Sequence, residues 1–152
     1  MKILIISQLL FITYFQVSLG YLPDRYVDRE DIECITELNL ERKTIQEAFG
    51  DGFILEEGNP IINDFMVCLF KKMDFMKQDG SLNFPNIKRW AARSFFIMLD
   101  LRDVSNKYEI TDEAVTQCET IKGSNIGDTT VRTFNCLMGY IREAGLQKKG
   151  QD

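Results

Sequence analysis

Residues 59–76 read Asn-Pro-Ile-Ile-Asn-Asp-Phe-Met-Val-Cys-Leu-Phe-Lys-Lys-Met-Asp-Phe-Met, and this stretch predicts an amphipathic helix. Its apolar residues recur every three or four positions, which is the spacing of one helix face and not the alternation of a strand. Asn59 can cap the helix, and Pro60 suits its first position. The apolar face consists of Ile62, Phe65, Met66, Leu69, Met73 and Met76.

Segments on both sides of this helix carry similar patterns, whereas strand signals are scarce. Pro85 suits the start of another helix, and Thr111 and Asp128 are expected to cap two later helices, the last of which runs to about Ala144. The sequence therefore predicts an all-α fold of about six helices with short connections, over roughly residues 23–40, 41–49, 60–76, 85–102, 111–118 and 128–144.

Residues 1–20 have the features of a secretory signal peptide. Lys2 precedes an almost wholly apolar run, and Ser18 and Gly20 place small residues at the −3 and −1 positions of a cleavage site. A membrane anchor is the alternative, but the run is short for a bilayer span. We therefore expect a leader over residues 1–20 and a single secreted, extracellular domain over residues 21–152.

The charge of the chain excludes several classes of partner. There are 18 Lys and Arg residues against 23 Asp and Glu residues, a net charge of −5 at pH 7. Nucleic-acid binding needs a basic footprint, and attachment to anionic lipid needs a basic cluster, so neither is expected. No apolar run after the leader is long enough to insert into a membrane.

Four cysteines lie beyond the leader, and their even number in a secreted chain predicts two disulfides with three possible pairings. A zinc site is not supported, because the chain has no His and no CxxC pair. The absence of His also removes Ser-His-Asp and Cys-His catalysis, and no nucleotide-binding glycine motif occurs. We therefore expect no metal, no cofactor and no enzymatic activity. The cysteines are Cys34, Cys68, Cys118 and Cys136.

Neighbouring carboxylates are the remaining candidates for catalysis, as at Glu30-Asp31, Glu56-Glu57 and Asp112-Glu113. Acids near helix starts complement the helix dipole, so we interpret these pairs as caps or solvated surface. A carboxylate hydrolase stays a second alternative, and it would need two acids that converge in a cleft.

The cysteine spacing resembles that of the insect pheromone and general odorant-binding protein family. That family has six cysteines, with three residues between the second and third and eight between the fifth and sixth. The four cysteines here match the first, third, fourth and sixth, whereas Asp64 and Gly127 stand where the second and fifth would fall. Loss of both is the pattern of the minus-C subgroup. The segment Lys72-Met-Asp-Phe-Met-Lys-Gln-Asp-Gly-Ser-Leu-Asn83 also looks like the family's segment after the third cysteine.

The resemblance implies the disulfides Cys34–Cys68 and Cys118–Cys136 and helices that enclose an internal apolar cavity. It implies a carrier that moves small hydrophobic ligands, such as odorants or pheromones, through aqueous fluid. It also implies that the missing disulfide would have joined Asp64 to Gly127. A membrane receptor is a further partner that the resemblance allows, and the expected oligomeric state is a monomer or a weak homodimer.

Apolar residues on helix faces can fill a core or line a pocket, and periodicity does not separate the two. The alternative function is therefore a secreted helical signalling or interaction protein with a filled core. For the carrier, Tyr108 and Tyr140 are the expected polar contacts. The expected apolar wall is formed by Phe65, Leu69, Met73, Met76, Trp90, Phe95, Phe134, Met138 and Ile141.

Overall fold

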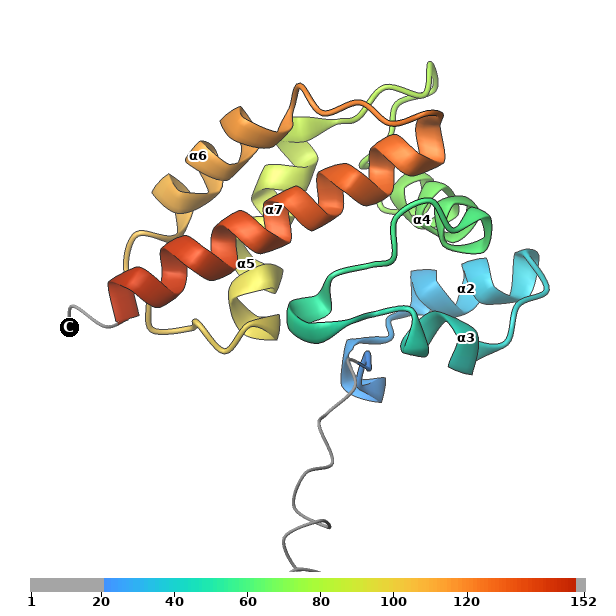
Figure 1. Cartoon of the computed structure of the whole chain (residues 1–152), viewed down its shortest axis with the longest axis horizontal. Helices are drawn as coiled ribbons and strands as arrows, with labels where there is room; N and C mark the ends of the chain where they lie inside the picture. The colour runs from blue at the N-terminus through green and yellow to red at the C-terminus, as the bar shows by residue number, and fades with distance from the viewer. Residues whose placement is uncertain (1–20, 150–152) are drawn as a thin grey trace, which may run out of the picture.

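The computed structural model describes residues 21–149, so the expected leader at residues 1–20 lies outside the described residues. The described chain forms six α-helices, and its only β-structure is two isolated bridges (Figure 1). This confirms the predicted all-α fold of about six helices. The α-helices are α2 (Arg29–Glu37), α3 (Arg42–Glu47), α4 (Pro60–Lys72), α5 (Phe84–Met98), α6 (Lys107–Cys118) and α7 (Ile126–Lys149), and two 3-10 turns are η1 (Asp24–Tyr26) and η2 (Asp51–Phe53).

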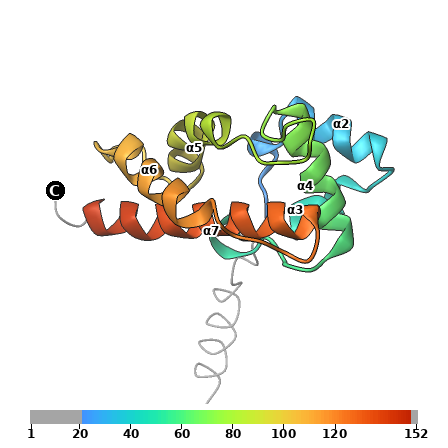
Figure 2. The same cartoon turned by 90° about the horizontal axis from the view of Figure 1, so that it is seen from above.

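The longest helix, α7, runs across the molecule and packs against α4, α5 and α6 (Figures 1 and 2). Its N-terminal end crosses α4, because Gly127 lies against Asn63 there. Its C-terminal end reaches the segment after α5, where Gly145 lies against Leu101. None of the helices in residues 21–149 combines the length and hydropathy that a bilayer span requires.

Two disulfides each join a pair of neighbouring helices. Cys34 on α2 bonds to Cys68 on α4, and Cys118 at the end of α6 bonds to Cys136 on α7. Both pairings implied by the family resemblance are confirmed. No disulfide in the described chain joins the α2–α4 pair to the α6–α7 pair.

The helix expected over residues 60–76 ends earlier than the sequence predicted, at Lys72. Asp74 adopts a left-handed conformation with φ of 57°, which turns the chain out of the helix. The amides of Phe75 and Met76 then both donate to the carbonyl of Phe70, at 2.8 and 3.1 Å. As a result Phe75 and Met76 fold back and are buried although they lie outside α4.

The predicted caps of the last two helices are also displaced. Thr111 lies inside α6, where its buried hydroxyl donates to the carbonyl of Lys107 at 2.7 Å. Asn125 precedes α7, and its Oδ1 accepts the amide of Asp128 at 2.9 Å. Asp128 instead accepts the amide of Ser124 at 2.8 Å from within the first turn. Both helices therefore begin before the residues that the sequence suggested as caps.

The crossing of α4 and α7 corrects the expectation that Asp64 faces Gly127. A Cβ on Gly127 would lie 2.6 Å from the Cβ of Asn63 and 3.1 Å from its backbone Cα and C atoms. Asp64 is exposed to solvent instead, because one step along a helix rotates the side chain by about 100°. A glycine contact with the α4 backbone thus stands where the family's cysteine frame would place a disulfide.

Candidate ligand-binding pocket

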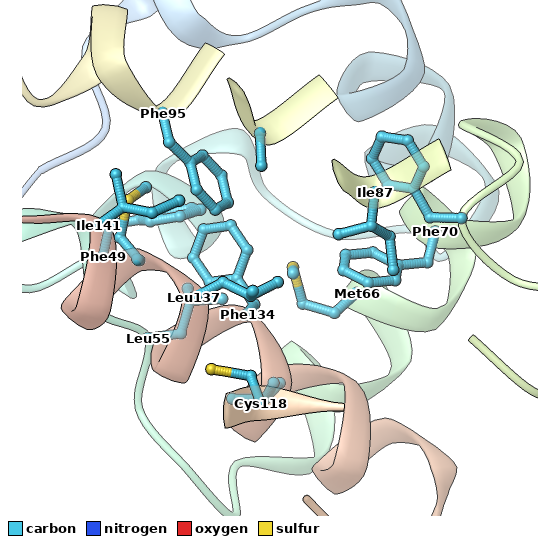
Figure 3. Packing of buried hydrophobic residues seen from close by; sticks show 14 of the residues in the cluster. Phe49, Leu55, Met66, Phe70, Ile87, Phe95, Cys118, Phe134, Leu137 and Ile141 are labelled. Atoms are coloured by element: carbon cyan, nitrogen blue, oxygen red, sulfur yellow. The ribbon is translucent and has the colours of Figure 1, made fainter. Parts of the chain in front are cut away.

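A pocket with a volume of about 160 Å³ lies between α2, α4, α5 and α7, and we call it the central pocket. Apolar side chains form nearly all of its wall. Met66, Leu69 and Phe70 come from α4, whereas Phe134 and Leu137 come from α7. Figure 3 shows Met66, Phe134 and Leu137 close to one another where the two helices meet.

A row of aromatic side chains runs along the wall of the central pocket. Each ring meets the next edge-on or tilted, and the ring centroids are between 5.1 and 6.3 Å apart. Figure 3 shows the rings of Phe95 from α5 and Phe134 from α7 pointing toward one another. Edge-to-face pairs of this kind contribute about 0.5–1.5 kcal/mol each beyond area burial. In order, the row consists of Phe70, Phe75, Trp90, Phe95, Phe134 and Phe49.

The last ring of this row is held by a buried hydrogen-bonded brace. Phe49 pairs with Leu55 in one of the two β-bridges of the described chain. Asn135 on α7 then accepts the amide of Leu55 and donates to its carbonyl, both at 2.8 Å. Because both bonds are buried, their loss would leave buried backbone groups unsatisfied. The brace therefore fixes the loop that carries Phe49 against α7.

The segment before α2 lies across one side of the central pocket. Leu22 and Tyr26 both line it. The amide of Leu22 donates to the carbonyl of Gln46 at 3.0 Å, and the Gln46 side chain donates back to the carbonyl of Leu22 at 2.9 Å. The hydroxyl of Tyr26 donates to the carbonyl of Ile97 at the end of α5, at 3.5 Å. These bonds tie the N-terminal segment to α3 and α5.

The first turn of α2 gives the central pocket one polar end. Asp28, Glu30 and Asp31 all line it, and only 8% of the surface of Asp31 is exposed. Asp28 and Asp31 form a capping box, in which the amide of Asp28 donates to Oδ2 of Asp31 at 2.8 Å. Burial raises the pKa of the Asp31 carboxyl to about 6, although the bond from Asp28 opposes this shift.

Comparison with protein-family models shows that the model of the PBP/GOBP family matches residues 28–140. The chain belongs to the PBP/GOBP insect odorant-binding family. The matched range contains all four cysteines, and their number and pairing are consistent with the minus-C subgroup. Neither the comparison with curated proteins nor the comparison with solved structures gave a match.

Proteins of the PBP/GOBP family are non-enzymatic binding proteins, and membership implies a role as a carrier of hydrophobic odorants or pheromones. They are typically secreted and disulfide-bonded. In residues 21–149 no group of three or more His, Cys, Asp or Glu side chains is placed to hold a metal ion. The central pocket is an apolar cavity with acidic side chains from the first turn of α2.

The structure places five of the eleven residues expected at the ligand site of this PBP/GOBP chain on the central pocket. They are Leu69, Met73, Trp90, Phe95 and Phe134. Helices and irregular segments both supply other wall residues that were not among the expected site residues. Among them, Met66, Ile87, Met98 and Leu137 belong to apolar helix faces that the sequence had revealed, but Phe49 and Leu22 lie in irregular segments without such a signal.

The other expected site residues lie elsewhere. Tyr108 is 61% exposed on α6, and Tyr140 donates to a carboxylate oxygen of Glu113 at 3.0 Å on the outside of the α6–α7 pair. The apolar helix faces are wide, so residues one helical step from a pocket residue point into filled core instead. Four more residues are buried but do not line the pocket, namely Phe65 on α4, Met138 and Ile141 on α7, and Met76 in the segment after α4.

Proposed function

We propose that this chain is a secreted carrier that takes small hydrophobic ligands into the central pocket and keeps them in solution in extracellular fluid. The observation that carries this proposal is the apolar pocket with its aromatic row, in a chain of the PBP/GOBP family. The two disulfides suit an oxidising extracellular compartment. The kind of ligand and the secretion of the chain through a leader at residues 1–20 are both part of this proposal.

The volume of the central pocket sets the size of the ligand. An engineered protein cavity of about 150 Å³ binds benzene, and the pocket here measures about 160 Å³. A ligand with one ring and a short side chain therefore fits without rearrangement. Burial of about 200 Å² of its apolar surface would contribute on the order of 5 kcal/mol before the entropy cost of binding.

Trp90 provides a direct readout of binding, because it is the one tryptophan of the chain and it lines the central pocket. We expect ethylbenzene to change the emission of Trp90 in a saturable way. Ser94→Phe should abolish the change, because Ser94 lines the pocket and the new ring would occupy ligand space. Arg93→Phe puts the same ring on the exposed neighbouring position and should leave binding intact.

The alternative of a helical interaction protein with a filled core makes the opposite prediction. If the folded protein shows no saturable response to ethylbenzene in either Trp90 emission or calorimetry, the carrier function is wrong. Equal affinity of the wild type and Ser94→Phe for ethylbenzene would show that the ligand binds outside the central pocket. Circular dichroism of both variants would show that their helices have formed.

A further inference from the structure

We propose that the central pocket selects ligands whose polar end carries positive charge, above all primary amines, and discriminates against carboxylates of the same size. This inference rests on the proposed carrier function, because it names the ligand class of the same pocket. It is carried by the charge and position of the polar side chains that line the pocket.

The charged groups that line the central pocket all have one sign and lie at one end. They are the carboxylates of Asp28, Glu30 and Asp31 in the first turn of α2, and no Lys or Arg side chain lines the pocket. The walls from α4, α5 and α7 contribute apolar side chains, with Ser94 the uncharged exception. A ligand that fills the pocket therefore shares it with three carboxylates and no cationic side chain.

These carboxylates differ in their exposure to solvent. Asp28 is exposed, Glu30 is half-buried and Asp31 is buried. Within residues 21–149, no Lys or Arg lies within salt-bridge distance of any of the three, although nine other such pairs form. The Asp31 carboxylate thus lies in a largely apolar site, where it accepts the amide of Asp28 and forms no ion pair within the described chain.

A ligand ammonium group would supply the positive charge that this end of the pocket lacks. A charge-assisted hydrogen bond from the ammonium to Asp31 would be stronger than one from a neutral donor. An alcohol could still donate one hydrogen bond to Asp31, whereas an apolar ligand would donate none. A ligand carboxylate would be disfavoured, because two adjacent carboxylates in an apolar site oppose each other's ionisation.

A matched series of phenyl compounds tests the inference at pH 7. We expect 2-phenylethylamine to bind tightest, followed by 2-phenylethanol and ethylbenzene, with phenylacetate weakest. The amine should bind at least about tenfold more tightly than phenylacetate. Titration calorimetry and Trp90 emission both measure these affinities on the folded, disulfide-bonded protein.

Substitution of the buried carboxylate tests whether Asp31 is the source of the selectivity for amines. Asp31→Asn should lower the ratio of the affinity for 2-phenylethylamine to that for ethylbenzene about tenfold. Glu33→Gln removes the same charge from the same helix at a side chain that does not line the pocket, so it should leave the series unaltered. If Asp31→Asn does not fold, Glu30→Gln should act in the same direction with a smaller effect, because Glu30 is closer to solvent.

The pH dependence of ligand affinity distinguishes recognition of the ligand's charge from recognition of its shape. The titratable groups that line the pocket with Asp31 are Asp28, Glu30 and Tyr26, and the helices opposite contribute none. Amine binding should weaken as the pH falls through about 6, since burial holds the pKa of Asp31 near that value. Binding of ethylbenzene should stay constant over the same range, because it forms no hydrogen bond with the carboxylate.

The outcomes distinguish this inference from the carrier function. If ethylbenzene binds but phenylacetate binds as tightly as the amine, the selectivity is wrong and the carrier function stands. An amine affinity that is unaffected by Asp31→Asn and Glu30→Gln would likewise overturn the inference alone. If no member of the series binds, the carrier function fails and this inference fails with it.

Discussion

Asp31 occupies a position in two structural features, the capping box of α2 and the wall of the central pocket. Its carboxylate completes the capping box that starts α2, and it also forms the buried polar end of the central pocket. The first position accounts for an acid at this point of the sequence, since acids are favoured in the first turn of a helix. The second could not be predicted, because α4, α5 and α7, which supply most of the pocket wall around the acid, are distant in sequence.

Asp31→Asn should stabilise the protein at pH 7. Burial raises the pKa of Asp31 from an ordinary 3.8 to about 6, so the folded state binds this proton more tightly than the unfolded state. The resulting stability is present below pH 3.8 and is lost as the pH rises through 6. The asparagine removes a cost of at most about 3 kcal/mol at pH 7. Urea unfolding should show this gain at pH 7 and little gain at pH 4.

Glu33→Gln is the matched control, and its effect should have the opposite sign. Hydrogen bonds and charge from Arg29 and Lys72 hold the pKa of Glu33 below its ordinary value, so Glu33 contributes stability at neutral pH that is lost on acidification. Its amide variant should gain no stability at pH 7. If Asp31→Asn is also no more stable than the wild type at pH 7, the buried charge of Asp31 is compensated within the protein.

Pocket residues were predictable only as members of apolar helix faces. The spacing of Leu69 and Met73 predicts the same burial as that of Phe65, yet Phe65 packs into filled core while the other two line the pocket. The difference depends on which partner helix lies opposite, and that is a property of the tertiary fold. Phe75 reaches the pocket only because the chain reverses after α4.

At the scale of the element, helix identity was predictable and helix ends were not. Apolar periodicity and Pro60 located α4 correctly at its start. Its end depends on the left-handed conformation of Asp74, and a non-glycine residue gives little sequence signal for that conformation. The early start of α6 was hidden in the same way, because Thr111 has the side chain of a cap but bonds backward to Lys107 within the helix.

The close crossing of α4 and α7 gives a test at this scale. Gly127→Ala should destabilise the protein by about 1–3 kcal/mol, because the new methyl group would meet the backbone and Cβ of Asn63 at 2.6–3.1 Å. Gly139→Ala is the control on the same helix, where a Cβ meets no atom within 4 Å. It should stabilise the protein by about 0.5–1 kcal/mol, since alanine favours a helix over glycine.

Thermal unfolding of the two alanine variants measures both effects with one chemical change. Opposite shifts of the unfolding midpoint would establish that the crossing requires a glycine. If both variants are stabilised, α4 and α7 have room to separate without cost. In that case the glycine contact would not hold these helices together in place of a disulfide.

At the scale of the molecule, the two disulfides join four of the six described helices into two pairs. One disulfide joins α2 to α4 and the other joins α6 to α7. The central pocket takes its walls from both pairs and from α5. Its width is therefore set by non-covalent contacts, namely the glycine crossing and the aromatic row from Phe70 to Phe49.

Removal of one disulfide at a time should separate stability from ligand binding. The disulfides span sequence separations of 34 and 18 residues, and in the chain-entropy model their loss costs about 3.8 and 3.2 kcal/mol. A domain of this size has about 5–15 kcal/mol in total, so either double variant, Cys34→Ala with Cys68→Ala or Cys118→Ala with Cys136→Ala, should still fold at 25 °C. No cysteine lines the central pocket, so ethylbenzene affinity should be retained in both. If a folded variant loses binding, the corresponding helix pair fixes the shape of the pocket through its disulfide, and the non-covalent contacts between the pairs are not sufficient.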